Sequence, residues 1–499
     1  MEKIELTPFF QINYKKFGLI VILAVAAVFY ALNLNLYQVG HINDDAYYVN
    51  ASRWLAGTQN VQKQLGLRSL GFPVLLAPVA ALFPENNFPF KAVAAGFYLA
   101  AAALLFFLFA EILDKEKLLI LTALTALNPL VVRLSGTVMS EGAFLFFTVL
   151  SLYLLEKCLQ EDFSLKRIFL TGLSVFYLSF IRPEGSVFFI AVLIYLAVKR
   201  RWKTSLYLTF FFLILLCPLL LNVFKLGGSA DRYFTEWSYC FFRGHALNLI
   251  FSNAVFYLKE FVSLFGLTEE IRLSAGILYF ALAGGILFFC GFGFLICPSG
   301  HTAGILRVYI TLYILLHIVW PARESRFLLG ITPFAVLFLI YGLAAAGRRV
   351  MLAAVAVILI SYIYQDVFLC GKKFDWVSHE TFGYVRDKFP ARAVFIAEAP
   401  SPFFLRTGRK ALPLFHSASA ADFFFDFLNS GADYIILFDK KSTALYKFPT
   451  IISAGIEKTR KFVMDKRRFE PVYVNSEERA VIFRAKDDFK RTFVHACSR

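Results

Sequence analysis

Two adjacent carboxylates, Asp44 and Asp45, follow directly on the first long apolar run, in the stretch INDDAYYV. Tyr47, Tyr48 and Trp54 come next, at a spacing that suits an amphipathic helix lying in a membrane interface. One carboxylate can cap such a helix and interact with its dipole. Alternatively, one of them is a general base whose pKa is raised by its charged neighbour. The residues alone leave both interpretations open.

Further charges lie at the ends of later apolar runs. Glu141, in SGTVMSEGAF, opens one of these runs, where a carboxylate can either cap a helix or act as a base. Arg182 and Glu184, in FIRPEG, separate two short runs. A hairpin tip this short keeps both near the hydrocarbon, where an unpaired charge costs about 2.5–3.5 kcal/mol. We therefore expect Arg182 and Glu184 to pair with each other or to bind a ligand.

Three arginines have a placement that suits a phosphate. Arg68 lies in RSLGFP, and Arg323 and Arg326 flank a glutamate in HIVWPARESRFLL. A guanidinium offers paired donors to phosphate oxygens. The alternatives are that Arg68 snorkels to lipid head groups and that Arg323 or Arg326 forms an ion pair with Glu324. Carboxylates and arginines held by helix ends at one depth suit a lipid-linked phosphate.

The elements that must position these residues are membrane helices. Of the 499 residues 59% are hydrophobic and only 17% charged, which indicates an α-helical polytopic membrane protein. A chain in lipid must satisfy its own backbone hydrogen bonds, so runs of about 17–25 apolar residues form helices. About eleven transmembrane helices are predicted, near 17–36, 89–112, 118–134, 141–156, 168–181, 185–198, 204–223, 274–297, 305–320, 327–346 and 350–369.

Lysine and arginine in the short loops predict the orientation. Basic residues gather in alternate loops, beginning with the N-terminus, whereas the short loops on the other side hold only Arg133, Arg182, Arg323 and Arg326. We expect a multi-pass protein of the plasma (inner) membrane with a cytoplasmic N-terminus. Loops 37–88 and 224–273 and the segment 371–499 then lie outside the cytoplasm. The short apolar segment 74–83 is expected to be an interfacial or re-entrant helix on the same side.

Two domains are predicted, a transmembrane catalytic domain over 1–370 and a small extracytoplasmic α/β domain over 371–499. Short β-type runs lie at 395–397, 434–438, 472–474 and 481–483, and 420–428 is helical in pattern and ends near Gly431. The net charge of +16 comes largely from the cytoplasmic loops and this basic tail. It suits contact with anionic membrane lipids rather than nucleic acid.

No cofactor or metal is expected. The seven cysteines show no paired spacing, so we predict neither a disulfide framework nor a thiolate metal site. His41 with the two neighbouring aspartates is a weak signal for a divalent ion.

In its order of features the chain resembles the GT-C superfamily of membrane glycosyltransferases, in the bacterial branch of dolichyl-phosphate-mannose protein mannosyltransferases and aminoarabinose transferases. The matching features are the acidic pair with Tyr48, RSLGFP, Glu141, RPEG and RESRFLLGITP. The family's Lys-Pro-Pro is absent, and so is the tryptophan-rich motif of oligosaccharyltransferases, which argues against block transfer of glycan to asparagine.

The resemblance implies transfer of a monosaccharide from a polyprenyl-phosphate donor to a hydroxyl of a lipid, glycan or protein acceptor on the outer leaflet. Asp44 or Asp45 would be the base, with Asp44 slightly favoured and Glu141 as a further catalytic candidate. Arg68, Arg323 and Arg326 would hold the donor phosphate. Tyr48, Arg182 and Glu184 would bind sugar or acceptor, together with Glu141.

Two other classes of function remain open. A polysaccharide polymerase or ligase would use a polyprenyl-diphosphate donor and a large central loop rich in arginine and histidine. The loop 224–273 carries Asp231, Arg232, Arg243 and His245, a thin match. A transport or assembly protein without catalytic activity is the second alternative, although a transporter would need charges near mid-membrane and here they gather at one face.

Overall fold

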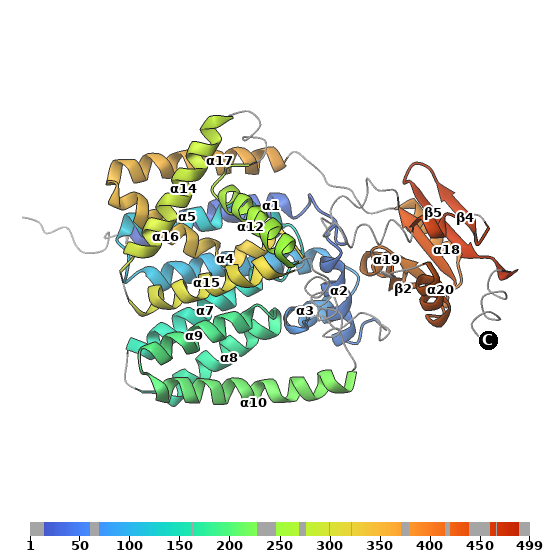
Figure 1. The fold of residues 1–499 in the computed structure, drawn as a ribbon, viewed down its shortest axis with the longest axis horizontal. Helices are drawn as coiled ribbons and strands as arrows, with labels where there is room; N and C mark the ends of the chain where they lie inside the picture. Colours follow the sequence, from blue (N-terminus) through green and yellow to red (C-terminus); the bar gives the residue numbers. More distant parts are fainter. Residues whose placement is uncertain are drawn as a thin grey trace, which may run out of the picture.

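The computed structural model describes a helical membrane domain followed by a small mixed domain (Figure 1). The described residues are 14–59, 69–160, 163–226, 246–268, 276–298, 300–320, 322–370, 379–414, 420–438, 460–465 and 467–488. The helices of the membrane domain, apart from two short outer ones, are α1 (Tyr14–Asn33), α4 (Phe88–Phe109), α5 (Lys115–Ala126), α6 (Pro129–Ser135), α7 (Glu141–Gln160), α8 (Leu165–Ile181), α9 (Gly185–Val198), α10 (Trp202–Leu226), α12 (Ala246–Ser263), α14 (Ile277–Ile296), α15 (His301–Val319), α16 (Thr332–Ala345) and α17 (Arg348–Cys370).

Every predicted apolar run overlaps one or more of these helices, which confirms a polytopic helical membrane protein. In the described part of the chain six helices are long and apolar enough to cross a membrane, or seven if the bent pair α5 and α6 forms one span. The helices α9 and α16 are apolar but shorter. The number of about eleven transmembrane helices therefore stays a prediction.

The predicted continuous helix over 118–134 is wrong. The chain bends by 48° between α5 and α6. Pro129 cannot donate a backbone hydrogen bond and disfavours helical geometry at Asn128, so the helix must restart here. The Asn128 side chain caps the new start by accepting from the Leu130 amide at 3.0 Å. Its amide group also donates to the Leu264 carbonyl at 2.8 Å and to the Tyr362 hydroxyl at 3.0 Å.

Two short helices, α2 (Asp44–Leu55) and α3 (Gly71–Leu82), follow α1 and lie at the end of the bundle that faces the second domain (Figure 1). The predicted short apolar helix at 74–83 is α3, with a start three residues earlier. Gly71 lies so close to the end of α8 that a Cβ atom there would be 2.5 Å from the Ile181 nitrogen. The Tyr177 hydroxyl donates to the Gly71 carbonyl at 3.0 Å. The glycine of RSLGFP thus allows α3 to pack directly on α8.

The second domain contains a five-stranded sheet with the order β2-β1-β3-β5-β4. Its strands are β1 (Val394–Ala397), β2 (Lys410–Pro413), β3 (Tyr434–Phe438), β4 (Phe469–Asn475) and β5 (Ala480–Ala485). The neighbours of β1 are parallel to it, whereas β5 runs antiparallel to both β3 and β4. Helices α18 (Glu380–Lys388), α19 (Pro400–Thr407) and α20 (Ala420–Asn429) complete the domain. The predicted small α/β domain is confirmed, but β2, α18 and α19 had not been predicted.

Candidate active site

Five charged side chains from four separate parts of the membrane domain form one ion-pair network. Arg326 donates to the Asp44 carboxylate at 2.8 Å and lies 3.5 Å from the Glu141 carboxylate. Arg182 contacts the same Glu141 oxygen at 2.6 Å and Glu184 at 2.9 Å. Glu141 therefore joins the two arginines. Residues up to 282 positions apart in the chain meet here.

Local backbone structure explains why these side chains converge. Glu141 is the first residue of α7, and Arg182 directly follows α8. Only three residues separate α8 from α9, and a Cβ atom at Gly185 would lie 2.5 Å from the Leu178 carbonyl carbon. The turn can therefore close only with glycine at this position, and it holds Arg182 and Glu184 at the bundle end.

Arg326 lies in a 3₁₀ turn, η2 (Ser325–Gly330). A short segment connects α15 to this turn. Glu324 precedes this turn, and its two carboxylate oxygens accept hydrogen bonds from the Arg326 guanidinium. The predicted ion pair of the RESR motif is therefore present, and it is made by Arg326.

The network is largely removed from water. The Glu141 side chain is 2% exposed and both arginines are 11% exposed. Burial alone would raise the pKa of Glu184, but the Arg182 guanidinium lowers it to about 2. Glu141 Oε2 has no hydrogen-bond partner among the described residues. With Glu324 included, four carboxylates face two guanidiniums, so the described network retains excess negative charge.

The two adjacent aspartates have different environments. Asp44 reaches into the network, whereas Asp45 points back to the loop before α2 and is 1% exposed. Its carboxylate accepts from the Gly40 amide at 2.9 Å and from the Ala46 amide at 2.8 Å. Burial raises the pKa of Asp45 to about 6, although these backbone hydrogen bonds oppose the shift. The N-cap of α2 is Asn43, whose side chain makes no capping bond.

The structure describes two of the three remaining predicted site residues, Tyr48 and Arg323, but not Arg68. The Tyr48 hydroxyl lies 3.0 Å from the Ser140 hydroxyl, next in sequence to Glu141, so it borders the network. Arg323 is half-buried and makes no ion pair within the described parts of the chain. Arg68 lies outside the described residues, as do the loop residues Asp231, Arg232, Arg243 and His245 that suggested a polymerase or ligase.

Two buried ionisable residues were missed by the sequence analysis. Lys91, in α4, donates to the Leu34 carbonyl at 2.9 Å and also to the Tyr37 carbonyl. Asp366, in α17, is fully buried, and neither carboxylate oxygen has a partner among the described residues. Each is a single charge inside a long apolar run, and that signal alone could have identified both.

The described residues contain no group of three metal-ligating side chains. The ring of His41 packs beside that of Tyr37, with centroids 5.2 Å apart. Cys158, Cys217, Cys290 and Cys297 are free thiols.

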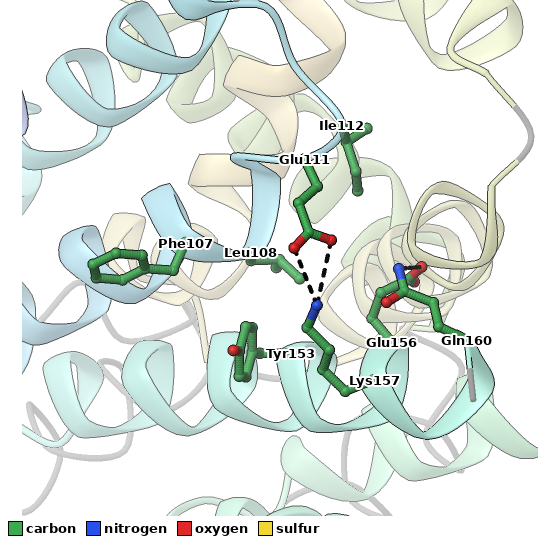
Figure 2. A pocket seen from close by; sticks show the side chains of 8 residues that line it. All are labelled: Phe107, Leu108, Glu111, Ile112, Tyr153, Glu156, Lys157 and Gln160. Atoms are coloured by element: carbon green, nitrogen blue, oxygen red, sulfur yellow. Dashed lines mark hydrogen bonds and ion pairs between the residues drawn. The ribbon is translucent and has the colours of Figure 1, made fainter. Parts of the chain in front are cut away.

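A surface pocket lies at the opposite end of α7 from Glu141 (Figure 2). Figure 2 shows Glu111 reaching down from the end of α4 toward Lys157, and both carboxylate oxygens lie 3.3 Å from its ammonium group. Twenty helical residues separate the two ends of α7, or roughly 30 Å. This pocket is therefore not part of the ion-pair network.

No protein-family model matches the sequence, and no curated protein sequence matches it. Solved structures do match the fold. The Archaeoglobus fulgidus oligosaccharyltransferase AglB, in complex with an inhibitory peptide and a dolichol-phosphate, aligns with a TM-score of 0.57 and 12% identity over 95% of this chain and 75% of its own. ArnT from Cupriavidus metallidurans, bound to undecaprenyl phosphate, aligns with a TM-score of 0.55 and 13% identity over 94% of this chain and 98% of its own.

The chain has the fold of a GT-C membrane glycosyltransferase. ArnT in the apo state aligns with the same TM-score of 0.55, at 11% identity. The resemblance inferred from the order of the short motifs is thereby confirmed for the fold, and the alignment with ArnT includes almost the whole length of both chains. Because the identity is only 11–13%, the alignments show the fold, and the chemistry depends on the residues of this chain.

Proposed function

We propose that this protein transfers a monosaccharide from a polyprenyl-phosphate donor to an acceptor hydroxyl at the outer face of the membrane. The observation that carries the proposal is the buried network of Asp44, Glu141, Arg182, Glu184 and Arg326 at one end of the bundle. Two structures with this fold hold a dolichol-phosphate and undecaprenyl phosphate, which supports a lipid-linked phosphate as the ligand class.

In the proposed reaction Asp44 accepts the proton of the acceptor hydroxyl. The acceptor oxygen forms a bond to the anomeric carbon of the sugar while the bond from that carbon to the phosphate oxygen breaks. The polyprenyl phosphate leaves with the electron pair of that bond. The Arg326 guanidinium, 2.8 Å from the Asp44 carboxylate, fixes the direction in which this carboxylate points.

The departing phosphate needs cationic partners that are not already neutralised. Arg326 contacts three carboxylates and Arg182 contacts two, whereas Arg323 has no ion pair in the described structure. We assign Arg323 the main contact with the phosphate, with Arg326 beside it and Arg68 as a third candidate. A guanidinium matches phosphate oxygens with paired donors.

Glu141, Glu184 and Tyr48 are assigned to sugar and acceptor hydroxyls. Glu184 is a poor candidate for the base, because Arg182 lowers its pKa to about 2. Glu141 keeps one carboxylate oxygen without a partner among the described residues, so it can accept a hydroxyl proton as a hydrogen bond. The proposed location is the plasma (inner) membrane, with the N-terminus cytoplasmic and the site and second domain outside.

The test is transfer of radiolabelled sugar by the purified full chain in liposomes. Polyprenyl-phosphate monosaccharides and the corresponding diphosphate donors are compared, with lipid, glycan and protein acceptors. We expect label to move only from monophosphate donors. Transfer that requires a diphosphate would overturn the proposal in favour of a polymerase or ligase, and uptake of donor without transfer would favour a transporter.

A further inference from the structure

The second domain contacts the loop that leads from α1 into α2. Arg406, at the end of α19, donates to the Gln38 side-chain oxygen at 3.0 Å and to the Val39 carbonyl at 3.4 Å. The other side of Gln38 faces His379, with 3.3 Å between the two nitrogen atoms. On α2 itself, the Asn50 amide donates to the Ser401 carbonyl at 3.1 Å, and Asn50 is fully buried. Figure 1 shows α19 beside α2 at this junction.

The same loop is held from the membrane domain. Lys91 donates to the carbonyls of Leu34 and Tyr37, immediately before Gln38. Asp45 accepts from the Gly40 amide, immediately after Val39, and from the amide of Ala46. The loop is therefore fixed at three successive points by Lys91, Arg406 and Asp45. Because Asp45 lies in the first turn of α2, the loop position sets the position of that turn.

We propose that Arg406 is a positioning residue, through which the second domain holds the first turn of α2 and thereby places Asp44 in the ion-pair network. The hydrogen bonds run from Arg406 to Gln38 and Val39, from the Gly40 amide to Asp45, and from Arg326 to Asp44. Arg406 itself touches none of the network residues in these contacts. The part of this inference that concerns catalysis rests on the proposed function, whereas the part that concerns the order of α2 does not.

A general base must lie within hydrogen-bond reach of the proton that it accepts, and misplacement by about 1 Å can cost about 100-fold in rate. Asp44 follows directly on Asn43, which has a positive φ of 63°, a strained conformation for a residue other than glycine. Contacts on both sides of this residue are needed to hold such a turn. Loss of the Arg406 contacts leaves His379 as the remaining contact of the second domain with Gln38 and so weakens the restraint on the N-terminal side.

The experiment measures amide hydrogen exchange in the full-length protein with Arg406→Ala. Arg409→Ala is the matched control, because the Arg409 side chain lies in the same domain and, among the described residues, donates only within it, to the carbonyls of Arg386 at 2.7 Å and Phe389 at 3.1 Å. We expect exchange in residues 38–50 to rise at least tenfold in Arg406→Ala and to stay unchanged in Arg409→Ala. Unchanged protection of β1 shows that the domain remains folded.

Two further variants separate a positioning role of Arg406 from a general destabilisation of the fold. Gln38→Ala removes the Arg406–Gln38 bond from the membrane domain, together with the His379 contact, and must also loosen residues 38–50. Arg406→Lys must restore part of the protection. In the transfer assay we expect kcat to fall about tenfold in Arg406→Ala, with the donor KM unchanged. Unchanged exchange in residues 38–50, or loosening without loss of kcat, would overturn the inference. If the wild-type protein transfers no sugar, the proposed function fails while the exchange data still decide whether Arg406 orders α2.

Discussion

At the scale of single residues, Asp44 and Asp45 have different surroundings. The sequence left open whether both only cap the helix and face solvent or whether one of them is a general base, and it did not indicate which. The distinction depends on the backbone at Asn43, whose positive φ rotates the start of α2 so that Asp44 faces Arg326 while Asp45 faces the preceding loop. That conformation has no signature in the residue types, so it could not be predicted.

The buried carboxyl of Asp45 predicts a pH dependence of stability. Burial raises its pKa from 3.8 to about 6 in the folded protein. The folded state therefore keeps a proton that the unfolded state loses above pH 4, and stability falls as the pH rises from about 4 to about 6. The loss amounts to about 3 kcal/mol. Thermal unfolding of the wild type and Asp45→Asn should show this fall only in the wild type, and parallel curves for the two proteins would refute it.

The buried arginine Arg182 is expected to matter far more to stability than an exposed cation on the same bundle. Arg182→Met removes the arginine that contacts Glu184 and leaves Glu141 with only its longer contact to Arg326, and breaking a buried pair in this way costs about 3–5 kcal/mol. Lys157→Met is the matched control, because its partner Glu111 is 71% exposed. We expect its cost to stay under about 1 kcal/mol. Equal melting temperatures for the two variants would contradict the described network.

At the scale of elements, most helices could be predicted from apolar runs, because lipid leaves the backbone few alternatives. Two elements could not. The break between α5 and α6 was overlooked although Pro129 signals it, since the apolar run continues through it. Strand β2 (KALP) was missed because it is short, begins with lysine and ends with proline. Its place at the edge of the sheet makes that proline tolerable.

The helix break gives a prediction of its own. Asn128→Ala removes the cap of α6 and leaves the Leu264 carbonyl without one of its donors, for a cost of about 2–4 kcal/mol. Asn128→Asp keeps the cap but places an oxygen against the Leu264 carbonyl in a fully buried site, so it should destabilise at least as much as alanine. Thermal unfolding in detergent measures both variants. A melting temperature of Asn128→Ala within 1 °C of the wild type would show that the break is not stabilised by this side chain.

At the scale of the whole molecule, the fold class could be predicted and the site only in part. Composition predicted the membrane bundle, and the order of short motifs predicted the GT-C fold. The short-range pairs Arg182–Glu184 and Arg326–Glu324 were anticipated from the sequence. The long-range pairs could not be predicted, because Arg326 and Asp44 are 282 residues apart and Arg182 and Glu141 are 41 apart. Their meeting depends on helix packing rather than on local pattern.

The proposed orientation is tested by labelling intact cells with a membrane-impermeant maleimide. In a cysteine-free background, Val474→Cys places a thiol on β4, where the valine is 61% exposed, and Val198→Cys places one at the end of α9, where it is 73% exposed. We expect label at residue 474 and none at residue 198 until the cells are lysed. The reverse pattern would place the site in the cytoplasm.

The most direct test of the central claim is the rate of sugar transfer from a polyprenyl-phosphate donor by Asp44→Asn and by Asp45→Asn, each checked for folding and donor binding. Removal of a general base typically costs 10²–10⁴-fold, so we predict at least a 100-fold fall in kcat for Asp44→Asn with donor binding intact. Asp45→Asn, which keeps an acceptor oxygen for the Gly40 amide, should retain most of the rate. A greater loss in Asp45→Asn would contradict the account and instead assign the base to Asp45, and a normal rate in both variants would leave Glu141 as the candidate.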